Sequence, residues 1–303
     1  MCHVAVPSLT PRTVRDVLLR YSPDIAHGHD VTASVCLAAN VVLCRRRGIK
    51  LVSHLHNNDE RMRHINARSL LYGAASLAFP SVIVVSDPVV NEYVFRPLLV
   101  KKSTTIVNVI DPELVRAKAA QGDIQKLPAP QRWDVAFVGR LTEQKDPLSF
   151  IDAVRAMRDL REIKAVMVGT GELGEAVRTR IKELALGKTI QLVGFQKNPY
   201  QFIAKSSIVM MPSRYEGYPM VALESLMLGV PLLGTPVAGL SELIDDRCGR
   251  FASTPAEFAS AGIDILEEQS LIASLADGAR EKAAEVNNVD RFISQLRRVY
   301  LAE

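Results

Sequence analysis

The sequence predicts an α/β protein with two doubly wound, Rossmann-like domains. Short β-branched segments that end in polar residues alternate with segments of helical periodicity, which is the pattern of βα units on a parallel sheet. This alternation occurs twice, and a stretch with Pro, Gly and Gln but little periodicity separates the two series. We therefore expect an N-terminal domain at 1–112, a linker at 113–132, a second domain at 133–288 and a final helix at 289–303.

The individual elements follow from the local pattern. In the first domain, runs such as SVIVVSD and STTIVNVID predict four strands, and longer helix-period segments predict two helices: strands at 24–30, 50–57, 81–87 and 103–111, helices at 32–47 and 63–78. The second domain repeats the alternation: strands at 133–140, 163–169, 189–195, 206–213 and 230–236, helices at 146–160, 172–186, 199–204 and 220–228. In the final helix, the apolar side chains share one face: Phe292, Leu296, Val299 and Tyr300.

Composition excludes several classes of protein. With 48% hydrophobic and 23% charged residues, the chain is neither disordered nor of low complexity. No apolar run reaches the roughly 18 residues that span a bilayer, and the first residues lack the pattern of a signal peptide. The four cysteines, Cys2, Cys36, Cys44 and Cys248, lack CxxC spacing, so we expect reduced thiols in a cytoplasmic protein.

Charge is unevenly distributed along the chain. Residues 1–112 carry 13 Lys and Arg against 8 Asp and Glu, a net +5, whereas the remainder carries 24 against 25, a net −1. A basic N-terminal half suits peripheral contact with the anionic inner face of a membrane or with an anionic substrate, although ordinary solvated surface charge explains the same excess. Because no aromatic-interleaved basic stripe accompanies the charge, we expect no nucleic-acid binding.

Polar residues gather after one strand of the second domain. Ligands of doubly wound sheets bind outside the carboxyl ends of the strands. There, a loop with Glu216 and Gly217 leads to a helix that Met220 opens, and the free amides of a helix N-terminus suit a diphosphate. Gly217 lets the backbone approach a ligand closely. Glu224 lies in an otherwise apolar helix, where a carboxylate needs a partner such as a sugar or ribose hydroxyl.

Several motifs resemble those of one known family. EGYPMVALES (216–225) resembles the E-x7-E segment of retaining glycosyltransferases of the GT-B fold, family GT4. Four further motifs agree with that family in order and spacing: VGRLTEQKDPLSFI (138–151), MVGTGELGEAV (167–177), LVGFQKNPYQFI (192–203) and TPVAGLSELI (235–244). SHLHNND (53–59) resembles the HSHN segment of its capsular and exopolysaccharide branch. The resemblance implies a GT-B fold, in which two Rossmann-like domains face a cleft.

The resemblance also implies roles for single residues. Arg140 and Lys145 match the basic pair that neutralises the donor diphosphate, where an Arg fork and a Lys charge stabilise the leaving group. Glu216 is expected on the donor sugar and Glu224 on the nucleotide ribose. The other donor contacts are expected from backbone, small residues and the strand end that holds the nucleobase: Gly139, Gly169, Gly171, Phe195, Lys197, Gly217, Tyr218, Pro219, Met220 and Val221.

Two H-x-H pairs end two strands of the first domain. His27 and His29, like His54 and His56, have the period-two spacing that places both side chains on one face of a strand. A four-histidine metal site is one interpretation, but no Asp, Glu or Cys ligand pattern accompanies it. We therefore expect no metal and favour hydrogen bonds from backbone to at least two of these histidines. By resemblance, His56 lies near the reacting sugar and acceptor, with His54 as second choice.

The N-terminal domain is shorter than the family pattern. Members of family GT4 begin with a strand and a Gly-rich loop well before the segment that matches 24–30, whereas this chain starts shortly before it. We therefore expect an incomplete N-terminal sheet of about four strands and, by hypothesis, an incomplete acceptor site.

The resemblance implies transfer of a sugar from a UDP- or GDP-linked donor to a hydroxyl of a glycan or polyprenyl-linked oligosaccharide, with retention of anomeric configuration. Because D-x-D is missing from the sequence, the basic pair and the helix N-terminus are expected to replace a metal, and no cofactor is expected. Two alternatives remain. The chain could be a non-catalytic nucleotide-sugar-binding remnant or partner subunit, or a sugar-nucleotide 2-epimerase, against which the GRLxxxKD stretch argues.

Overall fold

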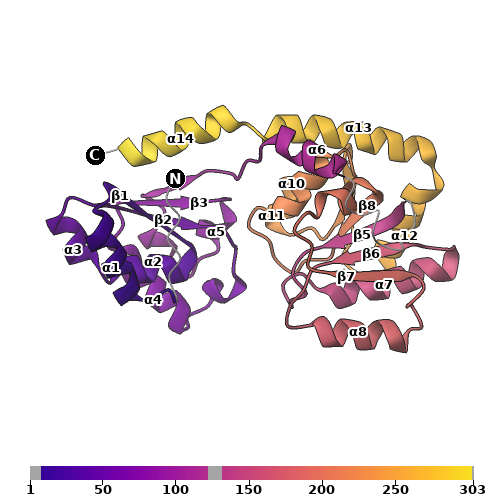
Figure 1. The fold of residues 1–303 in the computed structure, drawn as a ribbon, viewed down its shortest axis with the longest axis horizontal. Helices are drawn as coiled ribbons and strands as arrows, with labels where there is room; N and C mark the ends of the chain where they lie inside the picture. The colour runs from indigo at the N-terminus through magenta and orange to yellow at the C-terminus, as the bar shows by residue number, and fades with distance from the viewer. Residues whose placement is uncertain (1–7, 122–131, 302–303) are drawn as a thin grey trace. The chain divides into compact units, whose positions relative to one another are not determined.

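The computed structural model describes residues 8–121 and 132–301 and divides into two compact α/β units (Figure 1). Unit 1 comprises the described residues of Met1–Asn108 and Asp290–Glu303, and unit 2 comprises those of Val109–Val289. All strand pairs in both sheets are parallel, which confirms the predicted α/β class.

Unit 1 has a four-stranded sheet in the order β1-β2-β3-β4. The strands are β1 (Ile25–His29), β2 (Lys50–Leu55), β3 (Ser81–Val84) and β4 (Ser103–Thr105), each within a segment predicted as strand. The register pairs His29 with His54, so the two H-x-H segments end at the same edge of the sheet. The helices are α1 (Pro11–Tyr21), α2 (Asp30–Ala38), α3 (Val41–Arg46), η1 (Glu60–Arg63), α4 (Ala67–Ser76), α5 (Pro88–Asn91) and η2 (Arg96–Leu98).

The single helix predicted at 32–47 is wrong, because the chain breaks between α2 and α3. Asn40 is buried at the break, and its side-chain amide donates to the carbonyls of Pro11 (2.9 Å) and Cys36 (3.0 Å). An Asn that can bond backbone outside a helix competes with helix continuation. The break thereby ties the start of α1 to the end of α2.

The final helix, α14 (Val289–Leu301), packs on the sheet of unit 1. Val299 is buried against Val52, Ile83 and Ile106, and three partly buried side chains of the helix surround this cluster: Phe292, Leu296 and Tyr300. These are the residues that the sequence places on one face, so the amphipathic prediction is confirmed. The helix is therefore part of unit 1, although all of unit 2 lies between it and the other residues of unit 1 in the sequence.

Unit 2 has a six-stranded sheet in the order β10-β9-β8-β5-β6-β7. The strands are β5 (Trp133–Val138), β6 (Ala165–Val168), β7 (Ile190–Gly194), β8 (Ser206–Met211), β9 (Leu232–Gly234) and β10 (Gly249–Phe251). The chain adds strands on one side of β5 and then returns to its other side with β8, which makes a topological switch point between β5 and β8. The helices are α6 (Pro112–Ala120), α7 (Pro147–Leu160), α8 (Gly174–Glu183), α9 (Tyr200–Ala204), α10 (Met220–Met227), α11 (Ala238–Ser241), α12 (Pro255–Glu267) and α13 (Gln269–Val286).

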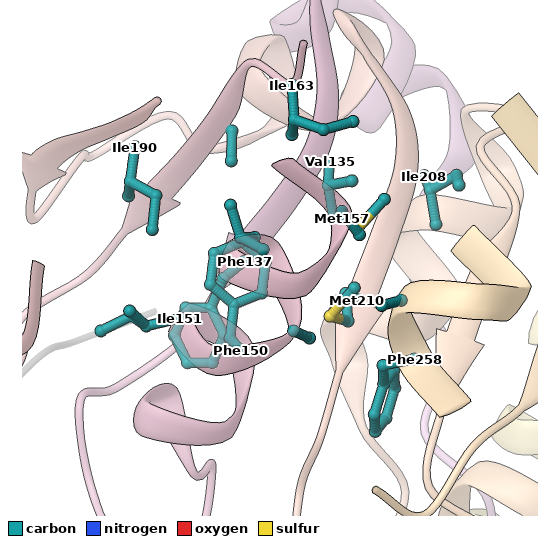
Figure 2. Close-up of a cluster of buried hydrophobic side chains, with 14 of the residues drawn as sticks. Val135, Phe137, Phe150, Ile151, Met157, Ile163, Ile190, Ile208, Met210 and Phe258 are labelled. Carbon is teal, nitrogen blue, oxygen red and sulfur yellow. The ribbon is translucent and has the colours of Figure 1, made fainter. Parts of the chain in front are cut away.

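The core of unit 2 lies between the sheet and helices α7, α8 and α12 (Figure 2). Phe137 on β5 packs against Phe150 on α7, with ring centroids 5.6 Å apart, and Met157 and Phe258 extend the cluster toward α12. These side chains are almost fully buried, and each contributes about 1.5–3 kcal/mol of burial free energy. A rigid sheet of this kind fixes the strand ends from which the loops of the site emerge.

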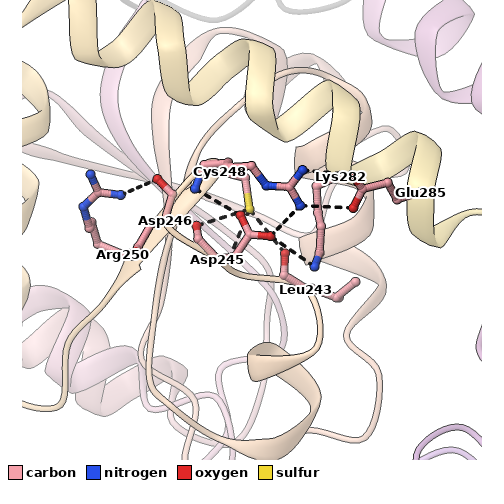
Figure 3. Close-up of polar contacts among 8 residues, drawn as sticks. Leu243, Asp245, Asp246, Cys248, Arg250, Lys282 and Glu285 are labelled. Atoms are coloured by element: carbon pink, nitrogen blue, oxygen red, sulfur yellow. Dashed lines mark hydrogen bonds and ion pairs between the residues drawn. The ribbon is translucent and has the colours of Figure 1, made fainter.

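Helix α13 is tied to the turn before β10 by a polar network (Figure 3). Arg247 binds Asp245 and Glu285 at 2.8 Å each, and Lys282 reaches Asp245 at 3.3 Å. Strand β10 and helices α12 and α13 have no counterpart among the predicted elements. Strand β10 is only three residues long, so its sequence is too short to show the period of a strand.

Two expectations concern segments between the elements. The predicted linker at 113–132 contains most of α6, and residues 122–131 lie outside the described residues. Cys36, Cys44 and Cys248 are buried free thiols, and Cys2 lies outside the described residues. Within the described part of the chain, no helix has both the length and the apolar character for a bilayer crossing.

Candidate functional site

Two loops meet at the switch point of unit 2. The first runs from Gly139 to Asp146, between β5 and α7, and the second runs from Pro212 to Pro219, between β8 and α10. Adjacent parallel strands β5 and β8 end at the same edge, so their loops lie side by side. Four of the predicted site residues, Arg140, Lys145, Glu216 and Gly217, therefore come together where doubly wound sheets bind ligands.

A buried ion pair joins the two loops. Lys145 Nζ lies 2.5 Å from Glu216 Oε1, and the two side chains are 16% and 4% exposed. Glu216 is thus not the solvated loop charge that an isolated E-x7-E pair would suggest. The attraction between two such buried charges offsets part of the free energy that their removal from water costs. The pair presents a cation and a carboxylate at fixed positions, which suits a ligand that carries both phosphate and hydroxyl groups.

Gln144 connects the same two loops through hydrogen bonds. The buried Gln144 side-chain amide donates to the carbonyl of Tyr215 (3.1 Å), and the backbone carbonyl of Gln144 accepts from the Arg214 backbone amide (2.8 Å). Its side-chain oxygen also accepts from the guanidinium of Arg140 (3.3 Å), which is otherwise exposed. Arg140 is therefore held near the ion pair with most of its donors free for an anion.

The glycines of the 167–177 motif are required by the backbone itself. A Cβ at Gly169, whose φ is +141°, would lie 1.8 Å from the carbonyl oxygen of Gly139. A Cβ at Gly171 would lie 2.4 Å from the carbonyl oxygen of Leu141. From the sequence, both glycines are expected to let the chain approach a ligand closely. The structure shows that each lets the β6–α8 loop contact the β5–α7 loop, a reason that holds without any ligand.

The N-terminus of α10 faces the second loop with open donors. Pro219 is the N-cap residue and forms no side-chain cap, so the first amides of the helix, at Met220 and Val221, lack the usual capping acceptor. Tyr218 is buried just before it, and its hydroxyl has no hydrogen-bond partner among the described residues. Burial, together with Glu242, raises the pKa of Tyr218 to about 12. This segment combines unpaired donors with the positive end of a helix.

Glu224 has partners that the sequence does not predict. It lies one turn inside α10, and the Tyr200 hydroxyl at the start of α9 donates to its carboxylate. Burial raises the pKa of Glu224, while that hydrogen bond and the charge of Lys118 on α6 act in the opposite direction. Lys118 Nζ also lies 5.8 Å from the Tyr200 ring centroid. The carboxylate that needs a partner therefore has one in the Tyr200 hydroxyl.

The residues assigned to the nucleobase follow β7. Phe195 is 74% exposed and Lys197 is exposed. A large exposed aromatic ring after a strand end is a surface on which a base can stack, but it is also compatible with ordinary surface exposure. Gly194 has a φ of +70°, which turns the chain at this point and sets the direction of Phe195.

The four histidines cluster at the β1–β2 edge of unit 1. Ring centroids of neighbouring members lie between 3.9 and 5.4 Å apart. His27 Nδ1 lies 2.7 Å from the Tyr300 hydroxyl, and His29 Nδ1 lies 2.7 Å from His56 Nε2. Neither ring nitrogen of His54 has a hydrogen-bond partner among the described residues. The sequence predicts backbone partners for at least two of the four histidines, and the ring nitrogens of His27 and His54 have none among the described residues.

Burial makes these histidines poor proton acceptors. The pKa of His54 is lowered to about 2 and that of His27 to about 4, mainly by desolvation and then by neighbouring histidines. The pKa of His56 is also lowered by burial, although Asp30 opposes the shift. All three are neutral near pH 7, so their ring nitrogens are available as acceptors or ligands.

Sequence reasoning missed three residues of the site in unit 2: Gln144, Tyr200 and Lys118. Gln144 and Tyr200 lie inside quoted motifs, but only the fold shows that their side chains bind other site residues. Lys118 lies in the segment expected as linker, where no interaction with Tyr200 or Glu224 could be foreseen. The predicted catalytic residue His56 lies in unit 1, apart in the chain from the unit 2 residues.

Family models match both units. The model described as glycosyl transferases group 1 matches residues 121–284, more than half of the chain, and the model described as glycosyltransferase family 4 matches residues 5–114. The first covers every site residue of unit 2 except Lys118, and the second covers the histidine cluster.

Individual relatives agree with these families. An N-acetylgalactosamine-N,N'-diacetylbacillosaminyl-diphospho-undecaprenol 4-alpha-N-acetylgalactosaminyltransferase of Campylobacter jejuni is 31% identical over 196 residues, 64% of this chain and 51% of the relative. The O-antigen biosynthesis glycosyltransferase WclY of Escherichia coli is 25% identical over 240 residues, 75% of this chain and 65% of the relative. The chain thus spans about half to two thirds of the length of these two relatives.

A solved structure shows the same fold. HepE of Anabaena, crystallised with UDP and glucose, superposes with a TM-score of 0.85 at 20% identity, over 97% of this chain and 82% of HepE. This likeness confirms the GT-B class of two Rossmann-like units. With one family model covering most of unit 2 and a second covering unit 1, the chain belongs to the glycosyl transferases group 1 family.

Proposed function

We propose that this chain transfers a sugar from a nucleoside-diphosphate sugar to a hydroxyl of a glycan or lipid-linked acceptor, with retention of anomeric configuration, in the synthesis of a surface polysaccharide. The observation that carries the proposal is the buried Lys145–Glu216 pair at the switch point, directly before the uncapped N-terminus of α10. This arrangement offers positive charge and backbone donors to a diphosphate, and a carboxylate to a sugar hydroxyl.

The leaving group is stabilised by residues of unit 2. When the bond from the anomeric carbon to the donor phosphate oxygen breaks, negative charge develops on the nucleoside diphosphate. Lys145 supplies a fixed charge, Arg140 supplies a guanidinium fork, and the amides of Met220 and Val221 supply donors at the positive end of a helix. These groups make a leaving-group metal unnecessary.

The anomeric configuration is retained when the acceptor attacks the same face of the sugar ring from which the leaving group departs. The acceptor oxygen forms its bond to the anomeric carbon as the bond between that carbon and the donor phosphate oxygen breaks. The departing phosphate oxygen takes the acceptor proton. No side-chain nucleophile is needed. Glu216 orients the donor sugar through its hydroxyls.

Glu224 and the β7 end hold the nucleoside. The Glu224 carboxylate accepts from the ribose hydroxyls while Tyr200 holds its other side, and Phe195 and Lys197 contact the base. A uridine or guanosine diphosphate is the expected donor group, and the presence of UDP in crystals of HepE supports the first of these. Undecaprenol and O-antigen in the names of relatives support a lipid-linked acceptor in polysaccharide synthesis.

A thermal-shift titration with UDP, GDP, ADP and their sugar conjugates tests the donor site. A ligand at one hundred times its Kd stabilises the folded state by about 2.7 kcal/mol. We expect a shift with one nucleotide, its loss in Glu224→Ala, and its retention in Glu143→Gln, whose side chain is 75% exposed on the neighbouring loop. No shift with any nucleotide, from a protein that melts cooperatively, would contradict the proposal.

Turnover is tested separately with the nucleotide sugar that binds. Release of nucleoside diphosphate, with and without a polyprenyl-diphosphate-linked sugar, distinguishes transfer from binding. Glu216→Ala and Lys145→Ala should each reduce transfer strongly. Nucleotide binding without any turnover would instead identify a non-catalytic nucleotide-sugar-binding subunit.

A further inference from the structure

The histidine cluster of unit 1 has the composition of a metal site. One nitrogen from each of His27, His29 and His54 lies within 4.8 Å of the others, and the three residues come from the adjacent ends of β1 and β2. Neutral imidazole is a good ligand for divalent late transition metals, and Zn²⁺ binds it at about 2.0–2.1 Å. To reach that distance from a common centre, each nitrogen moves inward by less than about 1 Å. Side-chain rotation alone can supply a shift of this size.

His54 carries the strongest evidence for a missing ligand. Its side chain is 4% exposed, and both of its ring nitrogens are buried without a hydrogen-bond partner among the described residues. A buried polar group without a partner costs free energy, so native structures rarely leave one. The His27 and His29 rings lie beside it, with centroids 5.3 and 5.4 Å away, and neither forms a hydrogen bond with the His54 ring among the described residues. A metal ion among the three rings satisfies one nitrogen of His54.

The two other histidines have the supporting partners that metal ligands usually have. A ligating histidine engages its second nitrogen in a hydrogen bond, which fixes the tautomer and the ring orientation. Tyr300 of α14 holds His27 Nδ1 at 2.7 Å, and His27 Nε2 is buried without a partner. His56 holds His29 Nδ1 at 2.7 Å, and the His56 backbone amide donates to Asp30 at 3.0 Å. In both cases Nε2 is the nitrogen left for a metal.

We propose that His27, His29 and His54 bind one divalent transition-metal ion of the Zn²⁺ class, with Tyr300 and His56 as positioning residues and a fourth coordination position open. The site would connect β1 and β2 to α14 through the Tyr300 hydroxyl. It does not depend on the proposed function, because donor binding and leaving-group stabilisation are assigned to residues of unit 2. The sequence patterns led to the opposite expectation, since no Asp, Glu or Cys ligand accompanies the histidines.

Metal binding is tested on the full chain without an affinity tag. After dialysis against a chelator and then buffer, Zn²⁺ is added in isothermal titration, and Co²⁺ is added in parallel because its visible absorption reports nitrogen coordination. We expect one saturable ion per chain and a higher melting temperature for unit 1. A chain that melts cooperatively but binds no Zn²⁺ saturably would overturn the proposal.

Variants distinguish this site from surface histidines. His54→Gln should lose affinity by more than the roughly 10- to 100-fold expected for Tyr300→Phe, which removes only a positioning partner. His64→Gln is the matched control, because His64 is an exposed histidine outside the cluster. This variant should bind the metal with unchanged affinity. Full affinity in His54→Gln would overturn the proposal. Should that variant not fold, unchanged affinity in Tyr300→Phe would overturn it instead.

Discussion

The Lys145–Glu216 pair makes a quantitative prediction about stability. Glu216 is 4% exposed in its side chain and cannot reach water when its partner is removed, so Lys145→Met leaves an uncompensated buried carboxylate. Removal of one partner of a buried pair costs about 3–5 kcal/mol of unfolding free energy. Glu216→Gln should cost less than Lys145→Met, because Lys145 is 16% exposed and its long side chain can extend toward water.

The assay uses the only tryptophan of the chain. Trp133 is 1% exposed on β5, so its fluorescence reports the unfolding of unit 2 in a denaturant titration. The double variant should lose less free energy than the sum of the single losses, because it leaves no buried charge behind. The control is Glu143→Gln, which breaks the exposed Arg214–Glu143 pair between the same loops and should cost about 0–1 kcal/mol.

Two outcomes would refute this account of the pair. A Lys145→Met variant as stable as the Glu143→Gln control would show that Glu216 is not a desolvated charge. Additive losses in the double-variant cycle would show that the two side chains do not interact, whatever their separation. Either result would also remove the observation on which the proposed function rests.

Three further predictions test other parts of the fold. Glu224→Gln should raise the melting temperature at pH 7 while weakening nucleotide binding, because burial raises the pKa of this carboxyl and its charged form destabilises the fold; a lower melting temperature would contradict this. Gly169→Ala should destabilise unit 2 strongly, since its Cβ would meet a carbonyl at 1.8 Å, whereas Gly187→Ala, with nothing within 4 Å, should be nearly neutral in the same Trp-fluorescence assay. In the presence of a chelator, the free energy of unfolding of unit 1 should fall by up to about 1.4 kcal/mol per histidine per pH unit as the pH drops below about 6.5. The reason is that His27 and His54 stay neutral in the folded chain, while the same histidines take up protons in the unfolded chain. Hydrogen exchange of β2 amides measures this loss, and pH-independent exchange free energies would contradict it.

Much of the architecture could be predicted from periodicity. Every predicted strand contains an observed one, and the helix that Met220 opens begins at that residue. The errors have local physical causes. The helix at 32–47 breaks because Asn40 bonds two carbonyls at its buried position, and β10 is too short to show a period.

The site was less predictable than the fold, because its side chains depend on tertiary partners. Glu224 was expected to need a partner, but Tyr200 and Lys118 could not be named, since they come from two other helices. The histidine pairs were visible as H-x-H spacing. That they converge, and that the His54 ring nitrogens find no hydrogen-bond partner within 8–121 and 132–301, depends on the register between β1 and β2 and on the position of α14.

The motif residues of unit 2 therefore divide into two kinds. Gly169 and Gly171 are required by contacts between loops, so they would persist in any chain that keeps this fold, active or not. Glu224 and Tyr218 are different: burial raises the pKa of Glu224 despite its Tyr200 partner, and the buried Tyr218 hydroxyl has no hydrogen-bond partner among the described residues. The cost of such burial is typical of a binding site that is completed by its ligand. The glycines thus support the fold, whereas Glu224 and Tyr218 add to the support that the Lys145–Glu216 pair gives to donor binding.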